Sequence, residues 1–113
     1  MKTPMSGNIY GFSPSINSFQ GMRGKIDDAW SALIKEFIIN GDSITFWFMW
    51  EGYKYVANLK QVNATNYQGR VICDGELAGK IYYTIYRNEK GYAMIGTWTE
   101  DDYNYDSLIE VRM

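Results

Sequence analysis

The stretch SITFWFMWEGYKYVANLK, residues 43 to 60, decides the fold class of this chain. It is dense in Phe, Trp and Tyr, and the Glu51-Gly52 pair divides it into two runs of strand length. Aromatic side chains favour extended backbone, where they fill a thick core or line a cavity. The stretch therefore predicts two neighbouring strands of an aromatic-rich, mostly β protein.

Turn signals recur at short intervals along the rest of the chain. Asn40-Gly41 is the strongest, because both residues tolerate a positive φ and apolar residues flank them. Further breaks are expected at four places: Asn66 to Gly69, Asp74-Gly75, Asn88 to Gly91 and Asp101-Asp102. Short connections of this kind join antiparallel neighbours, so the simplest topology is a meander.

The segment DDAWSALIKEFI, residues 27 to 38, follows a different period. As a strand, either register would turn Lys35 or Glu36 inward. A helical spacing of i, i+3, i+4, i+7 and i+8 instead places five apolar side chains on one face: Trp30, Leu33, Ile34, Phe37 and Ile38. We therefore expect a short helix over residues 27–36, then a strand from Phe37 into the Asn40-Gly41 turn.

These elements predict one domain over residues 1–113. It consists of a Gly- and Ser-rich segment over 1–26, the short helix over 27–36 and an antiparallel β meander over 37–112. Within the first segment, Asn8 to Phe12 and Phe19 to Ile26 are candidate short strands. About seven or eight antiparallel strands with one helix form an up-and-down barrel or a strongly curled sheet.

The tripeptide Gly96-Thr97-Trp98 stands late in this meander of short strands. In this respect the chain resembles the small calycin-type β-barrels of the lipocalin and avidin groups. The resemblance covers the architecture of residues 37–112, and it implies a small organic or apolar ligand held in the barrel mouth. No binding residue of those families is carried over to this sequence.

Composition and charge exclude several function classes. Eleven Lys and Arg residues against thirteen Asp and Glu residues leave a net charge of −2, which predicts no generic surface for nucleic acid or an anionic membrane. The longest purely apolar run, Phe46 to Trp50, is too short to span a bilayer. Cys73 is the only cysteine and the N-terminus lacks a signal-peptide pattern, so we expect a cytoplasmic protein.

The chain lacks the residues that most catalytic mechanisms use. The chain has no histidine and one cysteine, which removes Ser-His-Asp and Cys-His pairs and the common metal sites. The carboxylates Glu100, Asp101, Asp102 and Asp106 are the remaining route, but adjacent acids on a polar turn more often form a solvated loop. We therefore expect no enzyme, no cofactor and no metal site.

Aromatic side chains instead suggest non-catalytic binding. Tyr and Trp join an apolar body to a polar atom and line sites for planar, cationic or sugar-like ligands. A nearby carboxylate, Glu51 or Glu100, would favour a cation. The predicted ligand-binding residues are Trp50, Tyr53, Tyr55, Tyr83, Tyr92 and Trp98. The alternative interpretation is that these rings simply fill the core and the exposed face of the sheet.

A second hypothesis comes from the strand Ser43 to Trp50, which is apolar on both faces. Ile44, Phe46 and Phe48 share one face with Trp50, whereas Trp47 and Met49 lie on the other. The second face requires a cover from a helix, a terminal segment or another subunit. Trp47 and Met49 are therefore predicted interface residues, and the alternative function is a protein-interaction or inhibitor-type module that forms a homo-oligomer.

Overall fold

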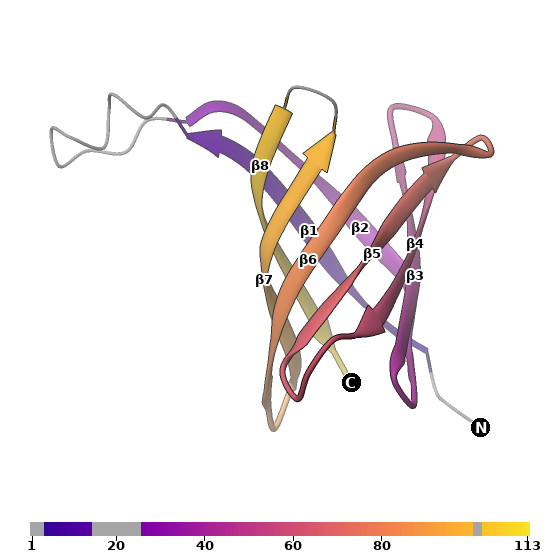
Figure 1. Ribbon diagram of the computed structural model, residues 1–113, viewed down its shortest axis with the longest axis vertical. Coiled ribbons are helices and arrows are strands. Elements are labelled where there is room, and N and C mark those ends of the chain that lie inside the picture. Colours follow the sequence, from indigo (N-terminus) through magenta and orange to yellow (C-terminus); the bar gives the residue numbers. More distant parts are fainter. Residues whose placement is uncertain (1–3, 15–25, 101–102) are drawn as a thin grey trace, which may run out of the picture.

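The computed structural model describes residues 4–14, 26–100 and 103–113, which form a closed eight-stranded barrel (Figure 1). Every strand is antiparallel to its neighbours. The strands are β1 (Met5–Pro14), β2 (Ile26–Asn40), β3 (Ser43–Trp50), β4 (Tyr53–Gln61), β5 (Asn66–Cys73), β6 (Glu76–Asn88), β7 (Gly91–Glu100) and β8 (Tyr103–Arg112).

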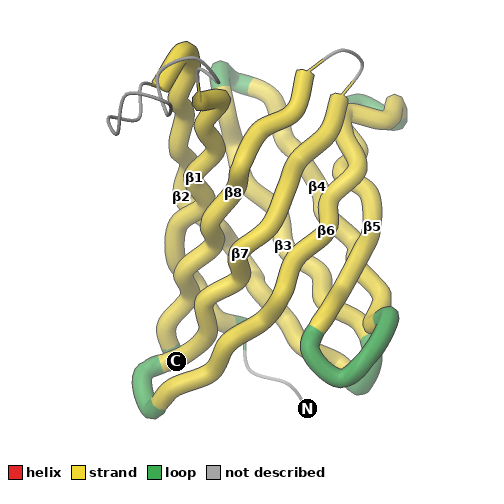
Figure 2. Tube along the Cα trace, turned by 60° about the vertical axis from the view of Figure 1, so that its left-hand side comes forward, coloured by secondary structure: helices red, strands yellow, loops and turns green. Residues whose placement is uncertain are grey.

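The strand order follows the chain, which confirms the predicted antiparallel meander. Pairing of β1 with β8, where Ile9 lies opposite Ile109, closes the sheet (Figure 2). Closure leaves no strand with an unpaired edge. Among the described residues, no helix is long and apolar enough to cross a membrane.

The predicted helix over residues 27–36 is wrong, because this segment belongs to β2. The alternation within β2 places Trp30 and Ala32 partly buried and Ile34 fully buried, whereas Leu33 is 62% exposed. A helix would have buried Leu33 beside Ile34. No helix occurs in the described part of the chain, which is β throughout.

A β-bulge explains why the apolar residues of β2 recur at the spacing expected of a helix. Lys35 pairs with Trp47 and Ile38 pairs with Thr45, so one extra residue of β2 is accommodated between them. Glu36 adopts a φ of 51° there, and both charged side chains remain exposed. The bulge resets the alternation, so that buried Phe37 follows buried Ile34 at a spacing of three residues. Neither regular strand register could have achieved this.

Tight turns connect the hairpins. Residues Glu51-Gly52 and Asp74-Gly75 all have positive φ values between 49° and 85°, as type I′ turns require. These two turns lie at one end of the barrel, which we call the mouth end. The turns at 41–42, 62–65 and 89–90 lie at the other end (Figure 1).

The break predicted at Asn66 to Gly69 is wrong, because these residues begin β5. The turn lies before them, where the Asn63 side chain accepts hydrogen bonds from the backbone N–H groups of Thr65 and Asn66. Gly69 serves a different purpose, since a Cβ atom there would lie 1.8 Å from the carbonyl oxygen of Asn58. The predicted strand Phe19 to Ile26 lies almost wholly outside the described residues.

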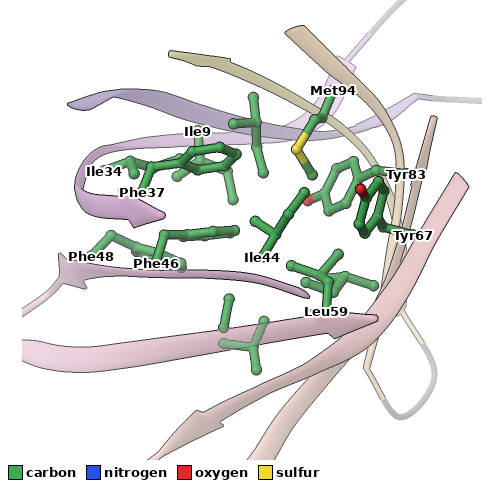
Figure 3. Close-up of a cluster of buried hydrophobic side chains, with 14 of the residues drawn as sticks. Ile9, Ile34, Phe37, Ile44, Phe46, Phe48, Leu59, Tyr67, Tyr83 and Met94 are labelled. Carbon is green, nitrogen blue, oxygen red and sulfur yellow. The ribbon is translucent and has the colours of Figure 1, made fainter. Parts of the chain in front are cut away.

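The middle of the barrel is filled by apolar side chains that point inward from all sides (Figure 3). Phe37 and Phe46 stack with ring centroids 5.7 Å apart. Tyr83 is fully buried, and its hydroxyl shares a 2.8 Å hydrogen bond with Ser107. Burial raises the pKa of Tyr83 well above its usual value, so the phenol stays protonated in the folded state. Ser107 also donates to the carbonyl oxygen of Tyr10, which ties β6, β8 and β1 together.

The strand assignment of β2 makes a prediction that a helix would not make. We expect Ile34→Ala to lower the free energy of unfolding by about 2–5 kcal/mol, because it leaves a cavity in the core. Leu33→Ala should change it by less than about 0.5 kcal/mol, because that side chain lies on the outer surface. Urea unfolding of the two variants tests this. Equal losses would contradict the alternation of β2.

Candidate functional site

A small cavity opens at the mouth end, above the filled core. Its lining comes from both sides of the barrel: β2, β3 and β4 on one side, β7 and β8 on the other. Six of the seven lining residues are aromatic, and the seventh is a carboxylate. We call this site the aromatic cavity, and its lining residues are Trp30, Phe48, Trp50, Tyr55, Trp98, Glu100 and Tyr105.

Rings from opposite walls meet across the barrel interior. Trp98 of β7 lies edge-on to Trp30 of β2, with centroids 5.2 Å apart and ring planes at 79°. It also lies 6.1 Å from Phe48 and 6.5 Å from Tyr55. Edge-to-face packing of this kind stabilises aromatic pairs beyond the area that they bury. Trp98 therefore joins the two sides of the site, as Tyr105 of β8 also does through its contact with Trp30.

Two glycines allow the indoles of the site to lie against the barrel wall. A Cβ atom on Gly79 of β6 would lie 2.5 Å from Nε1 of Trp98. A Cβ atom on Gly11 of β1 would lie 2.4 Å from Cε2 of Trp30. Each glycine therefore provides the space that the neighbouring indole occupies. The positions of both indoles depend on these missing side chains.

The polar groups of the site lie among these rings. Burial raises the pKa of Tyr55, and its cross-strand neighbour Cys73 and the carboxylates of Glu100 and Glu51 raise it further. The Tyr55 hydroxyl therefore stays protonated at neutral pH. Nε1 of Trp98 is buried and has no hydrogen-bond acceptor among the described residues. A buried donor without an acceptor is uncommon, and this one lies beside Gly79 of the barrel wall.

The structure brings three of the six predicted ligand-binding residues together. Trp50, Tyr55 and Trp98 all line the aromatic cavity. Tyr53 lies opposite Trp50 in the β3–β4 hairpin, but its side chain is 54% exposed and does not line the aromatic cavity.

The other two predicted residues lie elsewhere in the barrel. Tyr83 is enclosed in the core, where its hydroxyl shares a hydrogen bond with the Ser107 hydroxyl. Tyr92 lies near the 89–90 turn at the opposite end, where its ring centroid is 5.8 Å from the guanidinium carbon of Arg87. Both side chains pack toward the barrel interior, but at a different depth from the aromatic cavity.

Four lining residues were not among the predicted ligand-binding residues: Trp30, Phe48, Tyr105 and Glu100. Trp30 was assigned to a helix, and the bulge at Glu36 hides its inward-facing position in a strand. Phe48 was assigned to the core, which it also joins. Glu100 was considered as one of the candidate catalytic carboxylates and as a charge near the rings, but not as a lining residue. The alternation of Trp98 and Glu100 on one face of β7 is the signal that could have found it.

The predicted interface residues lie on the outer face of β3. Met49 is 47% exposed, whereas Trp47 is partly covered by charged neighbours. The indole Nε1 of Trp47 donates a 3.1 Å hydrogen bond to Glu36, and Nζ of Lys54 lies 4.4 Å from its ring centroid. Polar side chains from β2 and β4 thus cover part of the outer apolar face of β3, in place of the expected helix.

The size and chemistry of the aromatic cavity limit what it can hold. Its volume is about 80 Å³, well above the roughly 10–15 Å³ that one water needs. Sites for drug-sized ligands measure roughly 300–1,000 Å³, so only a compact chemical group fits inside. Within the described ranges, no group of three or more Cys, Asp or Glu side chains gathers as a metal site would require.

Comparisons of the chain with protein-family models, with curated proteins and with solved structures gave no match. The fold alone does not imply a function, because barrels of this kind host many. The function must therefore be argued from the residues of the site.

The packing of Trp98 against Gly79 can be tested by one methyl group. Gly79→Ala would force the indole to move, so we expect a changed near-UV circular dichroism spectrum and a stability loss of about 1–3 kcal/mol. Lys80→Ala, at the exposed neighbouring position, is the control and should leave both unchanged. A wild-type spectrum for Gly79→Ala would contradict the placement of Trp98.

Proposed function

We propose that this protein is a non-catalytic binding protein that holds a small, partly apolar or cationic group in the aromatic cavity. The observation that carries the proposal is the convergence of six aromatic rings from opposite walls on a space that side chains leave open. Below this point the interior is packed with apolar side chains, so the open space is confined to the mouth end. A bound molecule would insert one group and leave the rest outside.

The arrangement of the lining supports binding in preference to catalysis. Aromatic rings provide contact area and π faces but no group that transfers protons near neutral pH. The Tyr55 phenol, with its raised pKa, serves as a hydrogen-bond donor instead of a base. Glu100 is the only lining residue with a formal charge, and a carboxylate can attract a cation or accept a hydrogen bond.

The cross-strand pair Trp50 and Tyr53 offers a matched test. Both side chains are at least a third exposed on the same hairpin, but only Trp50 lines the aromatic cavity. We expect small amines or aromatic probes to change the intrinsic Trp fluorescence of the wild type. Trp50→Ala should weaken that binding about tenfold or more, whereas Tyr53→Ala should bind as the wild type does.

Isothermal titration calorimetry of both variants provides a readout that does not depend on the lost indole. Equal weakening by the two substitutions would place the site on the outer hairpin surface. No binding of any probe by the wild type would count against the proposed function itself.

A second candidate function is self-association through the outer face of β3 and β4. It is favoured by two exposed side chains beside the partly covered Trp47: Met49 lies two residues further along β3, and Val56 lies opposite Trp47 on β4. Apolar side chains grouped in this way are typical of contact surfaces between subunits.

Sedimentation velocity tests this second function. We expect Met49→Glu to convert a wild-type dimer into a monomer, because the new charge would be buried in the interface. Leu77→Glu is the control, since Leu77 is also about half exposed but belongs to β6. A wild type that is monomeric at all concentrations would exclude self-association.

A further inference from the structure

The outer face of β4, β5 and β6 carries a groove that is separate from the mouth of the barrel. Its volume is about 480 Å³, and it shares no lining residue with the aromatic cavity. Three of its lining side chains are cationic, one from each of the three strands, and none is a carboxylate. We call this site the basic groove, and its lining residues are Lys60, Gln68, Gly69, Arg70, Lys80, Ile81 and Tyr82.

The strand register brings two cations of the basic groove together without a counterion. Arg70 of β5 lies directly opposite Lys80 of β6, and the next residues in that row, Asn58 and Thr99, are uncharged. Like charges at directly opposite positions destabilise a sheet. Within residues 4–14, 26–100 and 103–113, neither cation forms an ion pair. The two side chains therefore repel each other, and no carboxylate of the described ranges offsets that repulsion.

The third cation of the basic groove is only weakly neutralised. Nζ of Lys60 lies 3.6 Å from Oδ1 of Asp42 and donates a 2.7 Å hydrogen bond to Ser43. The side chains of Lys60 and Asp42 are 73% and 69% exposed, so water and salt screen this ion pair. The basic groove is therefore positive, although the net charge of the chain is −2. The net charge did not predict this surface, because a sum over the chain does not show where the barrel places each charge.

Exposed aromatic rings accompany these cations on β6. Tyr82 lines the basic groove, and Tyr86 lies four residues further along the same strand. Their side chains are 40% and 55% exposed. The Tyr82 hydroxyl accepts a hydrogen bond from the side-chain amide of Asn66, which fixes the position of the ring. Unpaired nucleic-acid bases stack on aromatic rings of this kind while their phosphates contact neighbouring cations. A carboxylate-rich peptide would use the cations but not the rings.

We propose that the basic groove binds single-stranded nucleic acid, with Arg70 and Lys80 on the phosphates and Tyr82 against a base. An arginine guanidinium binds a phosphate through two N–H groups, whereas a lysine ammonium provides a point charge. A phosphate bound between the two cations would also relieve their repulsion. Phosphate contacts and stacking read no base edge, so this binding does not depend on sequence. It is a function in addition to binding in the aromatic cavity, and neither depends on the other.

The direct test is fluorescence anisotropy of a labelled short oligo(dT) over a series of salt concentrations. We expect a dissociation constant of roughly 10⁻⁴ to 10⁻⁶ M. Two or three neutralised phosphates predict a slope of about −1.4 to −2.1 for the logarithm of the binding constant against that of the salt concentration. No binding at low salt, or binding that salt does not weaken, would overturn the inference. Equal binding of polyglutamate would replace it with an acidic protein partner, and tighter binding of duplex DNA would exclude unpaired bases as the ligand.

Two substitutions separate the roles of charge and ring. Lys80→Gln removes one phosphate contact, so it should weaken oligo(dT) binding about fivefold at roughly 0.1 M salt and reduce the size of the slope by about 0.7. Tyr82→Ala should weaken binding at least about fivefold and leave the slope unchanged. The controls are Lys35→Gln on β2, four strands away around the barrel, and Tyr10→Ala on β1, where the side chain is also 40% exposed. Equal effects of the control substitutions would contradict binding in the basic groove.

Urea unfolding distinguishes a binding role of the cation pair from a structural one. Because Arg70 and Lys80 repel each other, Lys80→Gln should unfold at the same or a higher urea concentration than the wild type, although it binds oligo(dT) less tightly. Arg70→Gln should show the same combination. Variants that bind less tightly and also unfold at a lower urea concentration would contradict the inference, because the cations would then support the fold and affect binding only through it.

Discussion

The bulge at Lys35–Glu36 is the constraint on which the rest of the barrel depends. Side chains alternate along a strand, so a one-residue shift turns every later side chain to the opposite face. The extra residue in β2 allows Trp30 and Ile34 to face inward before it and Phe37 to face inward after it. Without it, either the mouth would lose Trp30 or the core would lose Phe37. One local irregularity thus serves both regions.

The division of the barrel interior into two regions follows from ring packing. In the middle, Phe37, Phe46 and Tyr83 join aliphatic side chains to fill the space, as an eight-stranded barrel permits. Toward the mouth, bulky indoles from opposite walls meet edge to face and leave open space between them. Gly11 and Gly79 have no side chain, and this leaves space for those indoles to lie close to the wall. The same aromatic composition therefore produces a solid core and an open mouth.

The chemistry of the mouth differs from that of the outer surface in a consistent way. On the outer face of β3, a tryptophan is matched with both a carboxylate and an ammonium, Glu36 and Lys54. Lys54 makes a cation–π contact with Trp47 on this surface. In the aromatic cavity the rings are accompanied by Glu100 but by no described cationic side chain.

The sequence by itself determined the fold class, the antiparallel order and most turns, because these depend on local patterns. Glu51-Gly52 and Asp74-Gly75 encode their turns within two residues, and the aromatic residues of 43–60 correctly predicted two neighbouring strands. Only the tertiary structure decided that residues 27–36 form a strand, since a bulge depends on the partner strand. It also decided which rings share a cavity. Trp30 and Trp98 are distant in the chain, and their contact exists because closure of the barrel brings opposite walls within reach of two side chains.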